Sequence, residues 1–151
     1  MPSLSLQISP NGPIVDIMVG VSSARLAATR AAGLPDPVVV AARMLVDTGA
    51  SNTNLCDSVL SQLGISPTGQ VQVHTPSTGN VPVLMDQYDV NFYLNLPHAS
   101  GVQANMHVIP NTPVICADFK AQGIQGLIGR DILSNSTLIY HGYMQLFTLS
   151  F

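Results

Sequence analysis

The sequence predicts an all-β fold, because short apolar runs rich in Val, Ile and Leu recur along its 151 residues. Glycine and proline, 12 and 11 residues respectively, separate these runs, which is typical of short strands joined by turns. Only 9% of the residues are charged while 46% are apolar, a balance that fits a β-rich protein covering part of its surface with a partner. We therefore expect a barrel or sandwich with strands at 4–8, 14–21, 38–46, 71–74, 81–96, 102–109, 127–128, 138–140 and 143–151.

The first two strands are expected to pair as a hairpin, because Asn11-Gly12 lies between them and an Asn-Gly pair favours a tight turn. Residues 22–37 then interrupt the strand pattern. Their Ala, Arg and Leu content predicts a short helix from about Ser23 to Ala32, inside a solvent-facing loop insertion. A binding role for the two arginines of this helix is the alternative to a solvated helix face.

Two further short helices are expected later in the chain. Residues 52–64 place their apolar side chains at helical spacing, with Asn52 or Asn54 able to cap the start and Gly64 placed to end the helix. Residues 129–136 form the other candidate.

The chain ends in a predicted hairpin at 138–151, with His141-Gly142 as its two-residue turn. The last strand of this hairpin carries apolar side chains on both faces. A strand of this kind needs cover from both sides. We therefore expect residues 138–151 to form a dimer interface.

Composition and charge argue against several classes of function. The net charge is −3 and no basic run is present, so nucleic acid is not an expected partner. No apolar run reaches the roughly 18 residues that a transmembrane helix needs, so no membrane partner is expected. The N-terminus lacks the regions of a signal peptide, which leaves the compartment unknown and weakly favours the cytoplasm. Cys56 and Cys116 lack metal-ligand spacing, so we expect free, partly buried thiols and no metal.

The segment MLVDTGASNTN, residues 44–54, places a carboxylate at the end of an apolar strand in a chain with few charges. Asp47 ends the strand, and Gly49 permits a turn that a residue with a Cβ would resist. Taken alone, Asp47 fits a turn cap, because aspartate often ends strands by accepting backbone N–H bonds. A second segment, GLIGRDIL at 126–133, changes this interpretation.

LVDTGAS resembles the active-site motif of the aspartic proteases, and GLIGRDIL resembles their second signature, two hydrophobic residues and a glycine that open a short helix. The Gly-Arg-Asp form is typical of the retropepsins, the retroviral-type branch. The order of elements over 38–151 looks most similar to single-lobe bacterial members. The resemblance implies one retropepsin-like domain over 1–151, a closed single-lobe barrel with one or two short helices and a flap hairpin at 71–94.

The resemblance also implies an aspartic endopeptidase that hydrolyses a peptide or protein substrate without metal or cofactor. In such enzymes two carboxylates share one proton and act as acid and base on a single water. This chain has one Asp-Thr-Gly, so the second Asp47 must come from another copy and the expected active unit is a homodimer. Ala50 stands where pepsin-like lobes often carry a serine hydroxyl, which predicts a mildly acidic pH optimum.

The same resemblance assigns roles to neighbouring residues. Thr48, Gly49 and Ala50 are expected to support the active-site carboxylate, while Gly129 and Arg130 form the structural motif. The expected substrate-binding residues are Ser51, His74, Thr75, Pro76, Ser77, Thr78, Gly79 and Ile128.

One departure from the family pattern concerns the residues that follow Asp-Thr-Gly-Ala. Retroviral enzymes usually carry an acid there, whereas this chain has Ser51 and Asn52. Arg130 therefore lacks its usual partner. We expect it to bond backbone carbonyls, Asp131 or a residue of the other chain.

A second departure concerns the flap, whose turn contains Gly79 as its only glycine and is stiffened by Pro76. Both departures motivate an alternative, a non-catalytic dimeric module of the same fold that binds peptides or scaffolds an assembly. A third hypothesis is a monomeric β-barrel in which Asp47 is only a turn cap.

Overall fold

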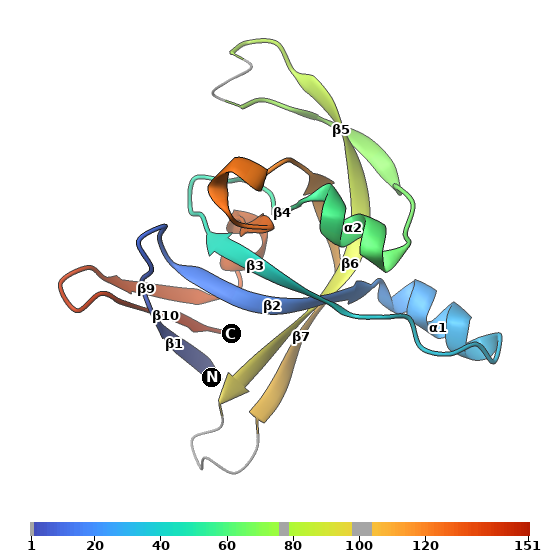
Figure 1. The fold of residues 1–151 in the computed structure, drawn as a ribbon, viewed down its shortest axis with the longest axis horizontal. Helices are drawn as coiled ribbons and strands as arrows, with labels where there is room; N and C mark the ends of the chain where they lie inside the picture. Colours follow the sequence, from blue (N-terminus) through green and yellow to red (C-terminus); the bar gives the residue numbers. More distant parts are fainter. Residues whose placement is uncertain (1, 76–78, 98–103) are drawn as a thin grey trace.

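The computed structural model describes residues 2–75, 79–97 and 104–151, and within them the fold is all-β with short helices (Figure 1). Across these ranges no helix combines the length and apolar character that crossing a bilayer requires. The elements are, in order, β1 Ser3–Gln7, β2 Ile14–Val21, α1 Ser23–Ala31, β3 Val40–Val46, β4 Asn54–Leu55, α2 Asp57–Leu63, β5 Gly69–Val73, β6 Val83–Pro97, β7 Ala104–Cys116, the 3-10 helix η1 Lys120–Gln122, β8 Gly126–Ile128, α3 Arg130–Leu133, β9 Thr137–His141 and β10 Leu146–Ser150.

The main sheet closes into a barrel. Its strands follow the order β2-β3-β8-β4-β7-β6, and β6 pairs again with β2. The closing pair is antiparallel and runs from Met18 opposite Tyr93 to Val21 opposite Val90. β5 lies outside this ring and pairs only with β6, forming a hairpin that projects from one end of the molecule (Figure 1). The predicted all-β closed barrel with few short helices is confirmed.

The barrel core follows from period-two alternation in its strands. In β2, Val15, Ile17 and Val19 are buried, while Asp16 lies exposed between them. α2 adds Val59, Leu60 and Leu63 to the same core, and these are the apolar positions that give its sequence a helical period.

Parallel pairing brings the two sequence motifs together. β3 pairs in parallel with β8, so that Val46 lies opposite Ile128 and both strands end at the same edge. β4 approaches β8 from the other side at Gly126. A Cβ on Gly126 would lie 2.4 Å from the carbonyl oxygen of Asn54, so only glycine permits this close strand contact.

The terminal strands form a second, three-stranded sheet in the order β1-β10-β9. Phe147 and Leu149 of β10 are buried, whereas Leu146, Thr148 and Ser150 on its other face are half-buried. The expectation that β10 is apolar on both faces is therefore only partly met, since Leu146 is the one large apolar side chain of the outer face within this strand.

Two predicted turns differ from those observed. Ser9 and Gly12 do exchange backbone hydrogen bonds, with Pro10 and Asn11 between them. However, β1 pairs with β10 and β2 with β3, so the strands that this turn joins do not form a hairpin. At the other end, His141 lies opposite Leu146, so residues 142–145 form a four-residue connection instead of a two-residue turn.

The helices differ less from their predictions. α1 begins after Ser22, whose hydroxyl accepts from the Arg25 amide. α2 begins only at Asp57, because Asn54 belongs to β4 and neither candidate asparagine caps the helix. Gly64 ends α2 in the left-handed conformation, as expected.

Candidate active site

Asp47 lies where β3 ends and its carboxylate is partly exposed. Its backbone amide donates to the carbonyl of Ile128, 3.0 Å away, which ties the loop to the end of β8. Its Oδ1 accepts from the Gly49 amide at 2.8 Å, and a Cβ on Gly49 would lie 3.1 Å from this oxygen. The structure gives the second oxygen, Oδ2, no hydrogen bond within the described part of the chain. One oxygen of Asp47 is thus held by the loop, and the other makes no hydrogen bond to the described residues.

Gly129 packs directly against the loop that follows Asp47. A Cβ at this position would lie 2.5 and 2.6 Å from the carbonyl carbon and oxygen of Asn52, which are backbone atoms and cannot rotate away. The next amide, that of Arg130, donates to the Ala50 carbonyl at 2.9 Å. The second motif therefore needs glycine because two backbone segments touch there.

The Arg130 side chain hydrogen-bonds to the loop that follows Asp47, and none of its partners there is an acidic side chain. Its Nη1 donates to the carbonyl oxygens of Thr48 at 2.9 Å and Gly49 at 3.1 Å, and its Nη2 donates to Ser51 Oγ at 2.8 Å. The ion pair found within the described ranges joins Arg30 and Asp36, not Arg130. Of the partners that the sequence left open, the structure selects the backbone carbonyls, and the serine that replaces the family's acid becomes an additional acceptor.

Asp131 bonds a different part of the site, which the sequence did not indicate. Its two oxygens accept from the amide of Thr53 at 2.9 Å and from Thr53 Oγ1 at 2.7 Å. Thr53 Oγ1 in turn accepts from the Gly129 amide at 3.1 Å, and Thr53 is 0% exposed. A buried threonine and an aspartate in the first turn of α3, 78 residues apart in sequence, thus join the two motifs.

Replacing Asp131 by alanine is expected to lower the free energy of unfolding by about 2–3 kcal/mol, because buried donors of Thr53 lose their acceptor. Urea unfolding measures this loss. Asp118→Ala is the matched control, since Asp118 is exposed and accepts one bond, from the Lys120 amide. Equal stability of the two variants would contradict a structural role for the Asp131–Thr53 link.

An open groove of about 470 Å³ lies over Asp47. Asp47 is the one carboxylate in its lining as the described residues define it. The remaining surface combines apolar side chains with amides and hydroxyls. The lining residues are Asp47, Gly49, Ala50, Ser51, Asn52, Asn54, His74, Thr75, Met85, Ala117, Phe119 and Leu127.

The groove gathers some of the residues predicted to bind substrate. Ser51, His74 and Thr75 line it. The loop after Asp47 and the residues that follow β5 therefore face the same groove. Gly79 lies at an exposed turn outside this lining, with φ of +60°. Ile128 is 1% exposed in the core, and its neighbour Leu127 faces the groove instead. Pro76, Ser77 and Thr78 lie outside the described residues.

Several lining residues were missed by the sequence analysis. They are Asn52, Asn54, Met85, Ala117, Phe119 and Leu127. Ala117 and Phe119 follow the end of β7, which pairs in parallel with the two-residue strand β4. Such a short pairing leaves no periodic signal, so the pattern of the sequence could not place these residues beside Asp47.

A smaller cavity of about 250 Å³ contains both cysteines, which are free thiols. Burial, as the main cause, raises the pKa of the Cys116 thiol, and the nearby carboxylates of Asp57 and Asp86 raise it further. Only the thiolate reacts with alkylating agents, so a raised pKa lowers the reactive fraction at any given pH. Within the described ranges, no cluster of three or more His, Cys, Asp or Glu side chains could hold a metal ion.

Cys116 is therefore expected to react with iodoacetamide more slowly than glutathione at pH 7.5. The measurement follows the intact mass of Cys56→Ser over time, because this variant leaves Cys116 as the one thiol. Denatured Cys56→Ser serves as the control and should react at the rate of glutathione. Fast labelling of the folded variant would contradict the environment described for Cys116.

Comparison with known proteins agrees with this geometry. The model of a family described as aspartyl protease matches residues 38–132, more than half of the chain. A search of curated proteins finds no match. Among solved structures, a retropepsin-like aspartic protease from Rickettsia conorii superposes with a TM-score of 0.58, at 14% identity, over 99% of this chain and 90% of that one. Sequence motifs, site geometry and fold agree: the chain belongs to the aspartyl protease family and has the retropepsin-like fold.

Proposed function

We propose that this protein is an aspartic endopeptidase of retropepsin type, active as a homodimer with one Asp47 from each chain. The observation that carries the proposal is Asp47 itself, a partly exposed carboxylate with one unbonded oxygen, in a groove whose described lining holds no other acid. A turn cap would use the oxygen that accepts from Gly49 and would have no need for an open groove. Peptide hydrolysis needs a second carboxylate, and a second copy would supply it.

Two surface features support the homodimer. The Thr48 side chain is exposed beside Asp47 and has no hydrogen bond in the described part of the chain, which leaves its hydroxyl for the matching loop of a partner. The connection and outer strand of the terminal hairpin expose large apolar side chains, which a partner would cover. These are Ile139, Tyr140, Tyr143 and Met144.

The proposed mechanism uses the two Asp47 carboxyl groups with one shared proton, because like charges about 3 Å apart do not both stay ionised. The charged carboxylate takes a proton from a water held between the two groups. The water oxygen attacks the peptide carbonyl, while the protonated carboxyl donates to the carbonyl oxygen. The resulting tetrahedral intermediate collapses when the carboxyl that took the water proton gives it to the nitrogen and the other carboxylate takes back the proton from the former carbonyl oxygen. The C–N bond then breaks, and the pair again shares one proton. Asp47 Oδ1, fixed by the Gly49 amide, would keep each carboxylate in the plane that this transfer needs.

Substrate is proposed to lie extended in the groove, between the loop after Asp47 and the β5–β6 hairpin acting as a flap. His74 and Thr75, which line the groove, would contact it from the flap side. Pro76, Ser77, Thr78 and Gly79 are proposed as further contacts from their position in the sequence alone. Gly49 and Ser51 would bond its main chain. In this proposal residues 1–151 form one domain, with 22–37 as insertion, 71–94 as flap and 138–151 as dimer interface.

One of the two reasons for the non-catalytic alternative no longer applies. That alternative rested partly on an Arg130 without a partner, and Arg130 makes three hydrogen bonds to the active-site loop. The chain is therefore built to hold Asp47 in place, which a scaffold alone would not need. The proline at position 76 of the predicted flap remains the sequence feature in its favour.

Subunit mixing tests the shared dyad. When the natural chain is mixed with a growing excess of Asp47→Asn, hydrolysis of a denatured protein at pH 5 is expected to fall in proportion to the loss of natural homodimers, to about one tenth at a ninefold excess. The control is an equal excess of Asp16→Asn, which changes an exposed carboxylate of β2 and keeps Asp47. This variant should not lower the hydrolysis. Activity that stays constant under excess Asp47→Asn would exclude a shared dyad, and no activity from either chain would favour the non-catalytic module.

A further inference from the structure

A second cavity, of about 380 Å³, lies between the barrel and α1, away from Asp47. Its volume falls within the roughly 300–1,000 Å³ of small ligand pockets. Apolar side chains form most of its wall, and an ion pair and a tyrosine lie at its rim. The lining residues are Met18, Gly20, Val21, Leu26, Arg30, Asp36, Pro37, Val39, Tyr93 and Met106.

The insertion at 22–37 creates this cavity. The pairing of β3 with β2 begins only where Val40 lies opposite Val19, so the chain from α1 to Val39 is not paired with β2. The Val39 side chain nevertheless lies close to this strand, since a Cβ on Gly20 would lie 3.2 Å from Val39 Cγ1. α1 is fixed at both ends of its first turn, since Ser23 N donates to Asn111 Oδ1 and Arg25 Nη2 donates to the Gly64 carbonyl. These two bonds tie the first turn of α1 to β7 and to the residue that ends α2.

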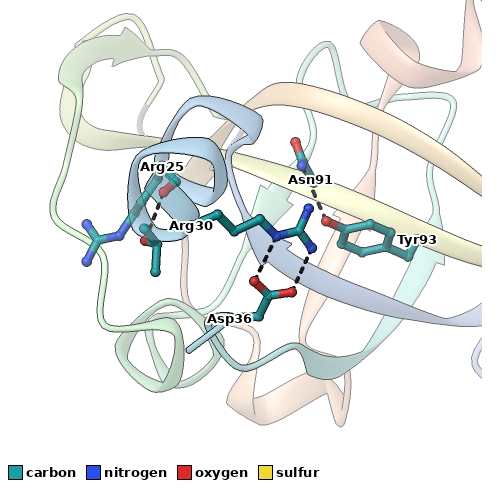
Figure 2. Close-up of polar contacts among 6 residues, drawn as sticks. Arg25, Arg30, Asp36, Asn91 and Tyr93 are labelled. Carbon is teal, nitrogen blue, oxygen red and sulfur yellow. Dashed lines mark hydrogen bonds and ion pairs between the residues drawn. The ribbon is translucent and has the colours of Figure 1, made fainter. Parts of the chain in front are cut away.

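A buried amide orients the Tyr93 hydroxyl at this cavity. Asn91 is 2% exposed, and its Oδ1 accepts from the Asn111 amide at 2.8 Å. Its Nδ2 donates to Ser23 Oγ at 3.1 Å. The same nitrogen donates to the Tyr93 hydroxyl oxygen at 3.3 Å (Figure 2). Because the Tyr93 oxygen accepts, its own hydrogen is free to donate, and the described residues offer it no acceptor.

The ion pair beside Tyr93 is neutral but keeps unused hydrogen-bonding groups. Arg30 donates from Nε to Asp36 Oδ1 at 2.8 Å and from Nη2 to Oδ2 at 2.6 Å (Figure 2). Its Nη1 has no acceptor in the described part of the chain. The hydrogen bonds from Arg30 lower the pKa of the Asp36 carboxyl, so the pair stays charged at neutral pH. The rim therefore offers N–H and O–H donors and carboxylate lone pairs without a net charge.

We propose that this cavity is a second peptide-binding site, which takes a large aliphatic side chain of an extended segment and bonds its backbone amide at the rim. An amide is neutral, accepts at its oxygen and donates at its nitrogen, which matches a neutral rim that both donates and accepts. The carbonyl oxygen would accept from Tyr93 and from Arg30 Nη1, and the amide N–H would donate to Asp36. The unbranched side chains of Met18 and Met106 adapt to different aliphatic shapes.

Two other ligand types fit less well. A carboxylate would meet Arg30 already neutralised and would lie beside the like charge of Asp36. A pure hydrocarbon would cover the rim and leave the Tyr93 and Arg30 donors without water or partner, which costs free energy.

The site is separate from the proposed active site. Asp47 lies just beyond the end of the β2–β3 pair at which Ile14 faces Leu45. Gly20, in the lining of the second cavity, lies six residues from Ile14 along β2, which is roughly 20 Å in an extended strand. The inference therefore does not depend on catalysis, and it holds or fails whether or not Asp47 hydrolyses peptides.

The test is a titration of the ¹⁵N-labelled natural chain with N-acetyl-leucine N-methylamide, followed by amide chemical shifts. The shifts of Gly20, Val21, Leu26 and Val39 are expected to move together along one binding curve. N-acetyl-leucine with a free carboxylate and N-acetyl-alanine N-methylamide are each expected to bind at least about fivefold more weakly, about 1 kcal/mol. Equal or tighter binding of either compound, or shifts that miss these amides, would overturn the proposal.

Two variants and a matched control locate the site independently. Val39→Asp places a charge in the lining, and Tyr93→Phe removes the free donor; each is expected to weaken binding by at least about threefold. Val38→Asp adds the same charge one residue away, outside the lining, at a side chain that is 61% exposed against 52% for Val39. If Val39→Asp binds the leucine amide as well as Val38→Asp does, the cavity is not the binding site.

Discussion

Asp47→Asn is expected to reduce peptide hydrolysis at least about 10³-fold, because general acid and base catalysis by positioned groups contributes roughly 10²–10⁴ and this change removes both carboxylates of a symmetric dimer. Asparagine has nearly the same shape, and its side-chain oxygen can still accept from the Gly49 amide. The loop should therefore keep its conformation. The measurement is the rate of cleavage of a denatured protein mixture across pH 3–7.

The matched control for this change is Asp16→Asn, which removes an exposed carboxylate from β2 and should leave the rate unchanged. Circular dichroism and urea unfolding of both variants exclude loss of fold as the cause. Cleavage by Asp47→Asn at the natural rate would sink the proposed mechanism. The pH profile of the natural chain is expected to peak in the mildly acidic range, and a maximum below about pH 3, near the pepsin dyad, would contradict the role given to Ala50.

Gly129→Ala is expected to lower the free energy of unfolding by about 3 kcal/mol. Its new Cβ would lie 2.5 Å from a backbone carbon of Asn52 and 3.0 Å from Asp131 Oδ1. Relief requires that the loop after Asp47 moves away from β8, so hydrolysis should fall together with stability. Urea unfolding and the cleavage assay measure the two losses.

Gly69→Ala is the matched control, because a Cβ there meets nothing within 4 Å and the backbone of β5 is extended. This change should alter the free energy of unfolding by less than about 0.5 kcal/mol. A Gly129→Ala protein as stable as Gly69→Ala would mean that the two motifs do not pack as described.

Local chemistry made much of this molecule predictable. The alternation of Val15, Ile17 and Val19 predicts a strand, and Gly64 predicts a helix end, because each signal lies within a few residues. The Asn-Gly pair likewise predicts its own turn. It does not predict which strands pair beyond the turn, because β1 pairs with β10, which lies at the far end of the sequence.

The candidate site likewise has features that the local sequence predicts and features that depend on strand pairing. Asp47 and Gly129 are recognisable because each lies in a short motif with its own backbone requirement. The partner of Arg130 and the bond between Thr53 and Asp131 depend on how β3, β4 and β8 pair. Two-residue strands such as β4 have no period, so the three-dimensional structure is needed to show that Asn54 and Phe119 lie beside Asp47.

Because the chain is synthesised from its N-terminus, the Asp47 loop is made before Arg130, the residue whose side chain holds that loop. Arg130 and the Gly49 carbonyl it bonds are 81 residues apart. At synthesis rates of about 5–20 residues per second, the loop waits roughly 4–16 s for that support after it has been made. During this interval Asp47 lies on a loop that the Arg130 side chain does not yet support. If the proposed homodimer is the active unit, each new chain would have to complete this loop before it could contribute its Asp47 to a shared site.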